Sequence, residues 1–133
     1  MKKVYVSFPI SGYDIEERKQ YNETVRKVVQ KYFPDYEILT PFGMCPYDET
    51  KSYGDCMKTC ISNIYDCEIL VICPNWLAST GCRDEYYTAA NYGLTLYDFT
   101  EMQTIEQQQI GFIEVNLLKL ASRALEVQKK KTK

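Results

Sequence analysis

Residues 66–76, Asp-Cys-Glu-Ile-Leu-Val-Ile-Cys-Pro-Asn-Trp, form the stretch that decides the fold. Residues 69–73 at its centre are apolar without interruption, a pattern typical of a strand that is buried on both faces. Pro74 ends the run, because proline has no backbone N–H to give to a sheet. The run therefore predicts the central strand of a sheet that helices cover on both sides.

Strand and helix patterns alternate along the rest of the chain. β-Branched and aromatic runs that stop at turn-forming residues predict strands, and apolar residues that recur on one face after a capping residue predict helices. The strands are expected over residues 3–8, 36–39, 69–73 and 94–97, with room for a fifth near Phe99, and the helices over residues 14–33, 57–64, 80–92 and 110–124. The stretch from Thr40 to Gly54 has no helical periodicity and is predicted to be a long loop.

This alternation implies right-handed crossovers between parallel strands. We therefore expect an α/β fold, a flavodoxin- or Rossmann-like three-layer sandwich with a parallel sheet of four to five strands. A chain of 133 residues is ordinary for one domain. Residues 1–133 are predicted to form a single domain with a disordered tail at residues 128–133.

Charge and hydropathy argue against two classes of partner. The formal net charge is −2 although four of the sixteen basic residues lie in the last five positions, so the body of the chain is acidic and no nucleic-acid-binding surface is expected. No apolar stretch approaches the roughly 20 residues of a membrane span, and the N-terminus runs into a strand pattern without a signal-peptide cleavage site. We expect a cytoplasmic protein that binds neither nucleic acid nor membrane.

The residue types present narrow the chemistry. The chain contains no histidine, which removes the Ser-His-Asp and Cys-His schemes and leaves carboxylates, tyrosines and lysines as catalytic candidates. Its six cysteines form no CxxC pair, and their spacings are those of free, buried apolar residues. We therefore expect no metal and no cofactor, and a cysteine-based metal or redox protein is the least favoured class.

Two loops at the predicted carboxyl ends of strands are candidate binding sites, because open parallel sheets bind ligands there. The first, residues 8–12, offers backbone N–H groups to an anion or a sugar hydroxyl, although it matches neither GxGxxG nor GxxxxGK[ST]. The second covers residues 74–85. Together they supply the predicted substrate-binding residues Phe8, Pro9, Ser11, Gly12, Trp76, Ser79 and Gly81.

Glu85 lies one turn into the helix that follows the second loop. The helix dipole would favour its ionised form, whereas partial burial beneath Trp76 would raise its pKa. An ionised, partly desolvated carboxylate is a competent nucleophile toward the anomeric carbon of a sugar. The alternative is that Glu85 decorates the first turn of a helix, as glutamates commonly do, without a chemical role.

Residues 4–12, Val-Tyr-Val-Ser-Phe-Pro-Ile-Ser-Gly, resemble the opening strand and loop of the nucleoside 2-deoxyribosyltransferase-like proteins. Residues 66–76, followed by a Ser-x-Gly pair and then a glutamate, resemble an uncharacterised branch of that superfamily found in bacteria and their phages. The resemblance spans roughly residues 3–97. It implies that Glu85 is the nucleophile that takes up deoxyribose and that residues 8–12 hold the nucleoside.

Two departures from the pattern of that family bear on the substrate. The Asp-x-Gly-Thr found before the glutamate in many of these transferases is absent. Lys58 stands near the place of an acidic residue often found in the preceding helix, and Asp55 is offset from it by almost one turn.

The leading hypothesis is an N-glycosidic enzyme, either a deoxyribosyltransferase or a nucleoside or nucleotide hydrolase, that forms a glycosyl-Glu85 intermediate. The alternative is a non-catalytic nucleotide-binding or sensing module of the same fold. In both cases the partner is a small-molecule nucleoside or nucleotide. The resemblance further implies a homo-oligomer, because members of that family often complete their sites across subunits.

Overall fold

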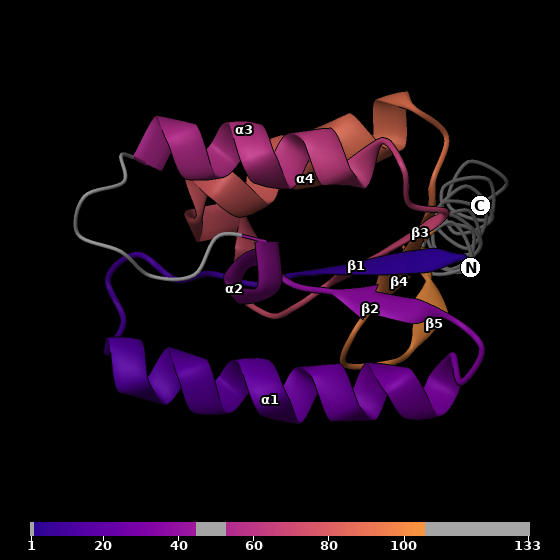
Figure 1. Ribbon diagram of the computed structural model, residues 1–133, viewed down its shortest axis with the longest axis horizontal. Helices are drawn as coiled ribbons and strands as arrows, with labels where there is room; N and C mark the ends of the chain where they lie inside the picture. The colour runs from indigo at the N-terminus through magenta and orange to yellow at the C-terminus, as the bar shows by residue number, and fades with distance from the viewer. Residues whose placement is uncertain (1, 45–52, 106–133) are drawn as a thin grey trace, which may run out of the picture.

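The computed structural model describes residues 2–44 and 53–105. Five strands in this part of the chain form one sheet in the order β2-β1-β3-β4-β5 (Figure 1). They are β1 (Lys3–Ser7), β2 (Glu37–Leu39), β3 (Ile69–Ile72), β4 (Thr95–Asp98) and β5 (Gln103–Thr104). The strands β1 to β4 pair in parallel, and Val4 on β1 lies opposite Ile38 on β2 and Ile69 on β3. The predicted α/β sandwich is confirmed, and its sheet is parallel from β1 to β4.

The fifth strand departs from the expected parallel arrangement. β5 pairs with β4 in antiparallel fashion, with Tyr97 opposite Thr104. Only four residues separate the two strands. A connection of that length reverses the direction of the chain, whereas a parallel crossover needs a dozen residues or more.

Helices cover both faces of the sheet (Figure 1). Helix α1 (Ile15–Tyr32) lies on one face, and α3 (Tyr53–Ile64) and α4 (Thr80–Asn91) lie on the other. Among the described residues, no helix is long and apolar enough to cross a membrane.

Both helix starts that the sequence marks by a capping residue are confirmed. The Asp14 carboxylate accepts a hydrogen bond from the backbone N–H of Glu17 at 3.0 Å and caps α1. The Ser79 hydroxyl accepts from the backbone N–H of Cys82 at 3.3 Å and caps α4. Such caps satisfy N–H groups that have no partner inside the helix.

The prediction of a long loop from Thr40 to Gly54 is wrong at both ends, because helices occupy them. A short helix, α2 (Pro41–Met44), begins directly after Thr40, whose hydroxyl accepts from the backbone N–H of Gly43 at 3.1 Å. Helix α3 begins at Tyr53, inside the expected loop. A helix of one turn is too short to show apolar periodicity, so the pattern could not reveal α2. The helix expected over residues 110–124 and the tail at residues 128–133 lie outside the described residues.

The alternation of side chains along β1 divides the core into two clusters, one on each face of the sheet. Val4 and Val6 pack with the buried residues of α1. Tyr5 packs with the buried residues of α3 and α4, and Ser7, two residues further, lies on the same side. The face toward α4 therefore carries two hydroxyl groups in an otherwise apolar strand.

The cysteines mostly follow the expectation of free, buried thiols. Four of them are free and buried, namely Cys60, Cys67, Cys73 and Cys82. The expectation is wrong for Cys56, which is disulfide-bonded and lies near the start of α3 rather than in the core. Within residues 2–44 and 53–105, no three His, Cys, Asp or Glu side chains come together in a way that would hold a metal ion.

Candidate active site

The connections that follow β1 and β3 leave the sheet in opposite directions. The two strands are parallel neighbours. The chain after β1 enters α1 on one face, whereas the chain after β3 enters the short helix η1 (Trp76–Ala78) and then α4 on the other (Figure 1). Where connections diverge in this way they leave a crevice at the carboxyl ends of the strands, and open α/β sheets bind their ligands there.

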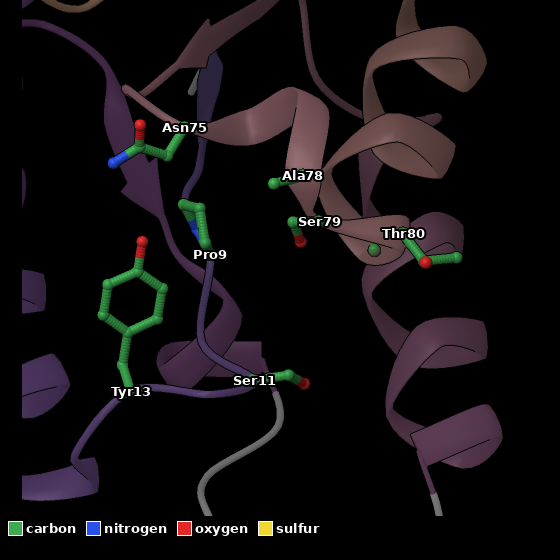
Figure 2. Close-up of a pocket in the computed structure, with 8 residues that line it drawn as sticks. Pro9, Ser11, Tyr13, Asn75, Ala78, Ser79 and Thr80 are labelled. Carbon is green, nitrogen blue, oxygen red and sulfur yellow. The ribbon is translucent and has the colours of Figure 1, made fainter.

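A pocket of about 340 Å³ lies at this switch point (Figure 2). Its lining residues come from the loop between β1 and α1 and from the segment between β3 and α4, and they are Pro9, Ser11, Tyr13, Asn75, Ala78, Ser79, Thr80 and Gly81. In Figure 2, Tyr13 and Ser11 come from the first loop, and Ala78, Ser79 and Thr80 stand across from Tyr13. The volume falls within the range of roughly 300–1,000 Å³ that is usual for small-molecule sites.

Turns with left-handed residues shape both walls. Gly12 has a φ of 87°, and the next backbone N–H, that of Tyr13, donates to the carbonyl of Ile10 at 3.2 Å. Asn75, directly before η1, has a φ of 68°. Glycine and asparagine adopt this region more readily than other residues. The residues of the two loops therefore meet the backbone requirements of the turns that form the pocket.

Glu85 extends from α4 to β1 and is almost fully buried, with an exposed fraction of 3%. The Ser7 hydroxyl donates to its Oε1 at 2.8 Å, and the Tyr5 hydroxyl donates to its Oε2. The two donors lie two positions apart on a strand, so they present their hydroxyls on the same face. Both oxygens of the carboxyl group are thereby oriented by the sheet.

Burial raises the pKa of the Glu85 carboxyl from its usual value of 4.5 to about 7, with a smaller contribution from the nearby negative charge of Asp84. The hydrogen bonds from Tyr5 and Ser7 act in the opposite direction, because they stabilise the ionised form. The pKa of Tyr5 is raised well above 10, first by burial and then by the charge of Glu85. Near neutral pH, Tyr5 therefore remains a donor while Glu85 changes its charge.

Glu85 is close to the pocket along the helix but does not form its surface. Gly81 lines the pocket and precedes Glu85 by four residues, which is about one helical turn. Glu85 is not among the eight described residues that line the space. The carboxyl group thus lies deeper in the protein, between α4 and β1.

The structure brings together four of the seven predicted binding residues, since Pro9, Ser11, Ser79 and Gly81 line the pocket. Gly12 forms the adjoining turn. Phe8 and Trp76 are not among the described residues that line the pocket.

Phe8 is buried on the α1 side of the sheet, where its ring lies 5.3 Å from that of Tyr21 and 6.1 Å from that of Phe42. Trp76 stacks on Tyr86, with ring centres 4.5 Å apart. The hydrogen bonds that reach Glu85 come from β1. The polar environment of the carboxyl group is thus set by β1.

Sequence reasoning missed several residues at this place. Four residues that line the pocket are not among the seven predicted binding residues, namely Tyr13, Asn75, Ala78 and Thr80. Tyr5 and Ser7 contact Glu85 across 80 and 78 positions of the chain. A signal for Ser7 existed, since a polar residue on the inner face of an apolar strand needs a hydrogen-bond partner.

A model of the family described as Domain of unknown function (DUF4406) matches residues 2–98. No curated protein matches the sequence of the chain. Among solved structures, the chain is similar to the 2-desoxiribosyltransferase from Leishmania mexicana, with a TM-score of 0.55 and 18% sequence identity. The match covers 74% of this chain and 63% of that one, so the chain spans less than two thirds of that protein. At this identity the similarity shows a shared fold.

Proposed function

We propose that this chain, which belongs to the family of domains described as DUF4406, is an N-glycosidic enzyme that works through a glycosyl-Glu85 intermediate. The enzyme is either a deoxyribosyltransferase or a nucleoside or nucleotide hydrolase. The observation that carries this proposal is the environment of the Glu85 carboxyl group. The group is buried beside the pocket and accepts hydrogen bonds from two hydroxyls, and burial raises its pKa to about 7. Burying an ionisable group costs stability, and groups whose pKa is strongly shifted are concentrated at functional sites.

Two further observations support the substrate class. The fold is similar to that of a protein whose name, 2-desoxiribosyltransferase, describes transfer of a deoxyribosyl group. The pocket is mixed in character, since the hydroxyl-bearing residues Ser11, Ser79 and Thr80 line it together with Tyr13. Hydroxyls suit a sugar or a phosphate, and a flat ring suits a base.

The proposed reaction has two steps. The ionised Glu85 carboxylate attacks the anomeric carbon of the sugar, the C1′–N bond breaks, and the base leaves with the bonding electrons and takes up a proton. Water, or a second base in a transfer, then attacks the same carbon, loses its proton and releases the carboxylate. Ser11 and Ser79 orient the sugar or its phosphate, and Tyr5 and Ser7 orient the nucleophile.

A second function is favoured by the burial of Glu85. Its exposed fraction of 3% and the occupation of both oxygens by hydroxyls are what a structural carboxyl group would show. In that case the pocket binds a nucleotide without cleaving it, and the protein is a sensing module. The attack on a sugar requires that the substrate, once bound, reaches the carboxylate beneath the first turn of α4.

The two functions are separated by following base release from a panel of deoxynucleosides and their 5′-monophosphates by chromatography. Glu85→Gln removes the nucleophile and keeps the size of the side chain, and Asp84→Asn is the matched control, because it removes the same charge from an exposed neighbouring position. We expect release by the wild-type protein and by Asp84→Asn, and a loss of at least a thousandfold in Glu85→Gln. Binding of a panel member without any release would overturn the enzyme in favour of the sensing module.

A further inference from the structure

Arg18 lies behind the pocket wall that the loop between β1 and α1 forms. It belongs to the first turns of α1, and its exposed fraction is 7%. Its Nη1 donates to the backbone carbonyl of Pro9 at 3.0 Å, and its guanidinium carbon lies 4.2 Å from the centre of the Tyr13 ring. Pro9 and Tyr13 both line the pocket. One buried side chain therefore contacts the wall at two points, through a backbone carbonyl and through a ring.

The guanidinium group is itself held in place. The Glu17 carboxylate accepts from Nε and from Nη2, both at 2.6 Å. The ring of Tyr21 also lies 4.2 Å from the guanidinium carbon. The Arg18 guanidinium group is therefore contacted by a bidentate carboxylate and by two aromatic rings, which restrict its orientation. An ordinary surface arginine lacks such restraints.

The wall that Arg18 contacts has a defined shape. The hydrogen bond from the Tyr13 N–H to Ile10 and the left-handed Gly12 fix the turn. Tyr13 keeps an exposed fraction of 43%, so part of its ring remains available to a ligand. Figure 2 shows this ring beside Pro9, with its hydroxyl toward Asn75.

We propose that Arg18 is a positioning residue that orders the pocket wall at Pro9 and Tyr13 and presents the Tyr13 ring as the flat face against which a planar base packs. The assignment of the ligand as a nucleoside rests on the proposed function, whereas the ordering of the wall does not. Arg18 does not touch the ligand in this arrangement and acts through Tyr13. Stacking on an aromatic ring tolerates any base, because every base has a π-face.

The first test measures the order of the wall without a ligand, by hydrogen exchange of the Tyr13 backbone amide. Arg18→Met removes the charge and the donors and keeps most of the apolar stem. Arg26→Met is the matched control, because Arg26 lies on the same helix and forms an exposed ion pair with Glu23 at 3.1 Å. We expect exchange at Tyr13 to become at least tenfold faster in Arg18→Met and to stay unchanged in Arg26→Met. Unchanged protection in folded Arg18→Met overturns the proposal.

The second test is a double-mutant cycle on the binding of deoxyadenosine, with 2-deoxyribose 5-phosphate as a probe that has no base. We expect Tyr13→Leu and Arg18→Met each to weaken deoxyadenosine binding about tenfold, the double variant to be no weaker than either, and the sugar phosphate to bind almost unchanged. Tyr13→Phe keeps the ring and should bind like wild type. If Arg18→Met fails to fold, Arg18→Lys takes its place in the cycle.

The outcomes distinguish the effect of Arg18 on the wall from the identity of the ligand. Additive losses, or equal losses for both probes, overturn the action of Arg18 through Tyr13. If the wild-type protein binds no nucleoside, both the ligand assigned to the Tyr13 ring and the proposed function are overturned. The exchange measurement then decides by itself whether Arg18 orders the wall.

Discussion

At the scale of single residues, the titration of Glu85 connects burial with chemistry. The group has a raised pKa of about 7, so it is largely protonated at pH 6 and largely ionised at pH 8. Only the ionised form attacks a sugar in the proposed reaction. The hydroxyls of Tyr5 and Ser7 favour that form, and the surrounding core opposes it. The activity of the protein should therefore follow the charge of one side chain.

We predict that kcat/KM rises with pH between about 6 and 8 and then reaches a plateau, because this parameter follows the ionisation of the free enzyme. Tyr5→Phe removes a donor that stabilises the carboxylate, and the pKa of Glu85 should rise further. The midpoint of the profile should accordingly move to higher pH in Tyr5→Phe. A profile that falls over the same range would show that the protonated form acts and would contradict the nucleophilic role.

At the scale of elements, the first turn of α4 joins the stability of the helix to the shape of the pocket. Ser79 caps the helix through its hydroxyl and also lines the pocket. Gly81 lines the pocket one turn before Glu85. Loss of the cap would loosen the turn that lines the pocket next to Glu85.

We expect Ser79→Ala to lower the free energy of unfolding by about 1 kcal/mol, because the N–H of Cys82 loses its acceptor. Ser79→Asn retains a capping oxygen and should come within a few tenths of a kcal/mol of wild type. Urea unfolding followed by circular dichroism measures both. Equal losses in the two variants would mean that the contribution of Ser79 does not come from its cap.

The same elements show what the sequence could reveal. Apolar runs predicted β1 and β3, and Asp14 and Ser79 marked the starts of α1 and α4, because these signals are local in the chain. The donors of Glu85 were not predictable in this way. Their contact depends on how α4 is placed over β1, and the partners are about 80 positions apart. The place of the pocket could be predicted, because open parallel sheets bind ligands at the carboxyl ends of their strands. Its exact lining could not, because it depends on turns such as that at Asn75.

At the scale of the whole molecule, the buried carboxyl group makes stability depend on pH. The pKa of Glu85 is raised on folding, so the folded state binds a proton that the unfolded state has already released between about pH 4.5 and 7. The unfolded state then carries fewer protons, and the free energy of unfolding falls as the pH rises through this window. Below it both states are protonated, and the contribution is fully present.

Glu85→Gln removes this dependence, because the amide does not titrate. At pH 8 we expect the variant to be more stable than wild type by on the order of 1–3 kcal/mol, and at pH 5 the difference should largely disappear. Urea unfolding at the two pH values tests this, with Asp84→Asn as the control for charge. A variant less stable than wild type at pH 8 would mean that the hydrogen bonds of the carboxylate outweigh its burial.

The opposite departures of the chain after β1 and β3 also bear on how such a site can diversify. One wall of the pocket is anchored in the core beneath α1, and the other in the core beneath α4. The sheet separates these two cores. The two walls are nevertheless joined through β1, because Ser7 bonds Glu85 and the loop that carries Tyr13 begins at the next residue. Under the proposed function, a new ligand preference at Tyr13 therefore has to evolve without disturbing the strand that holds Glu85.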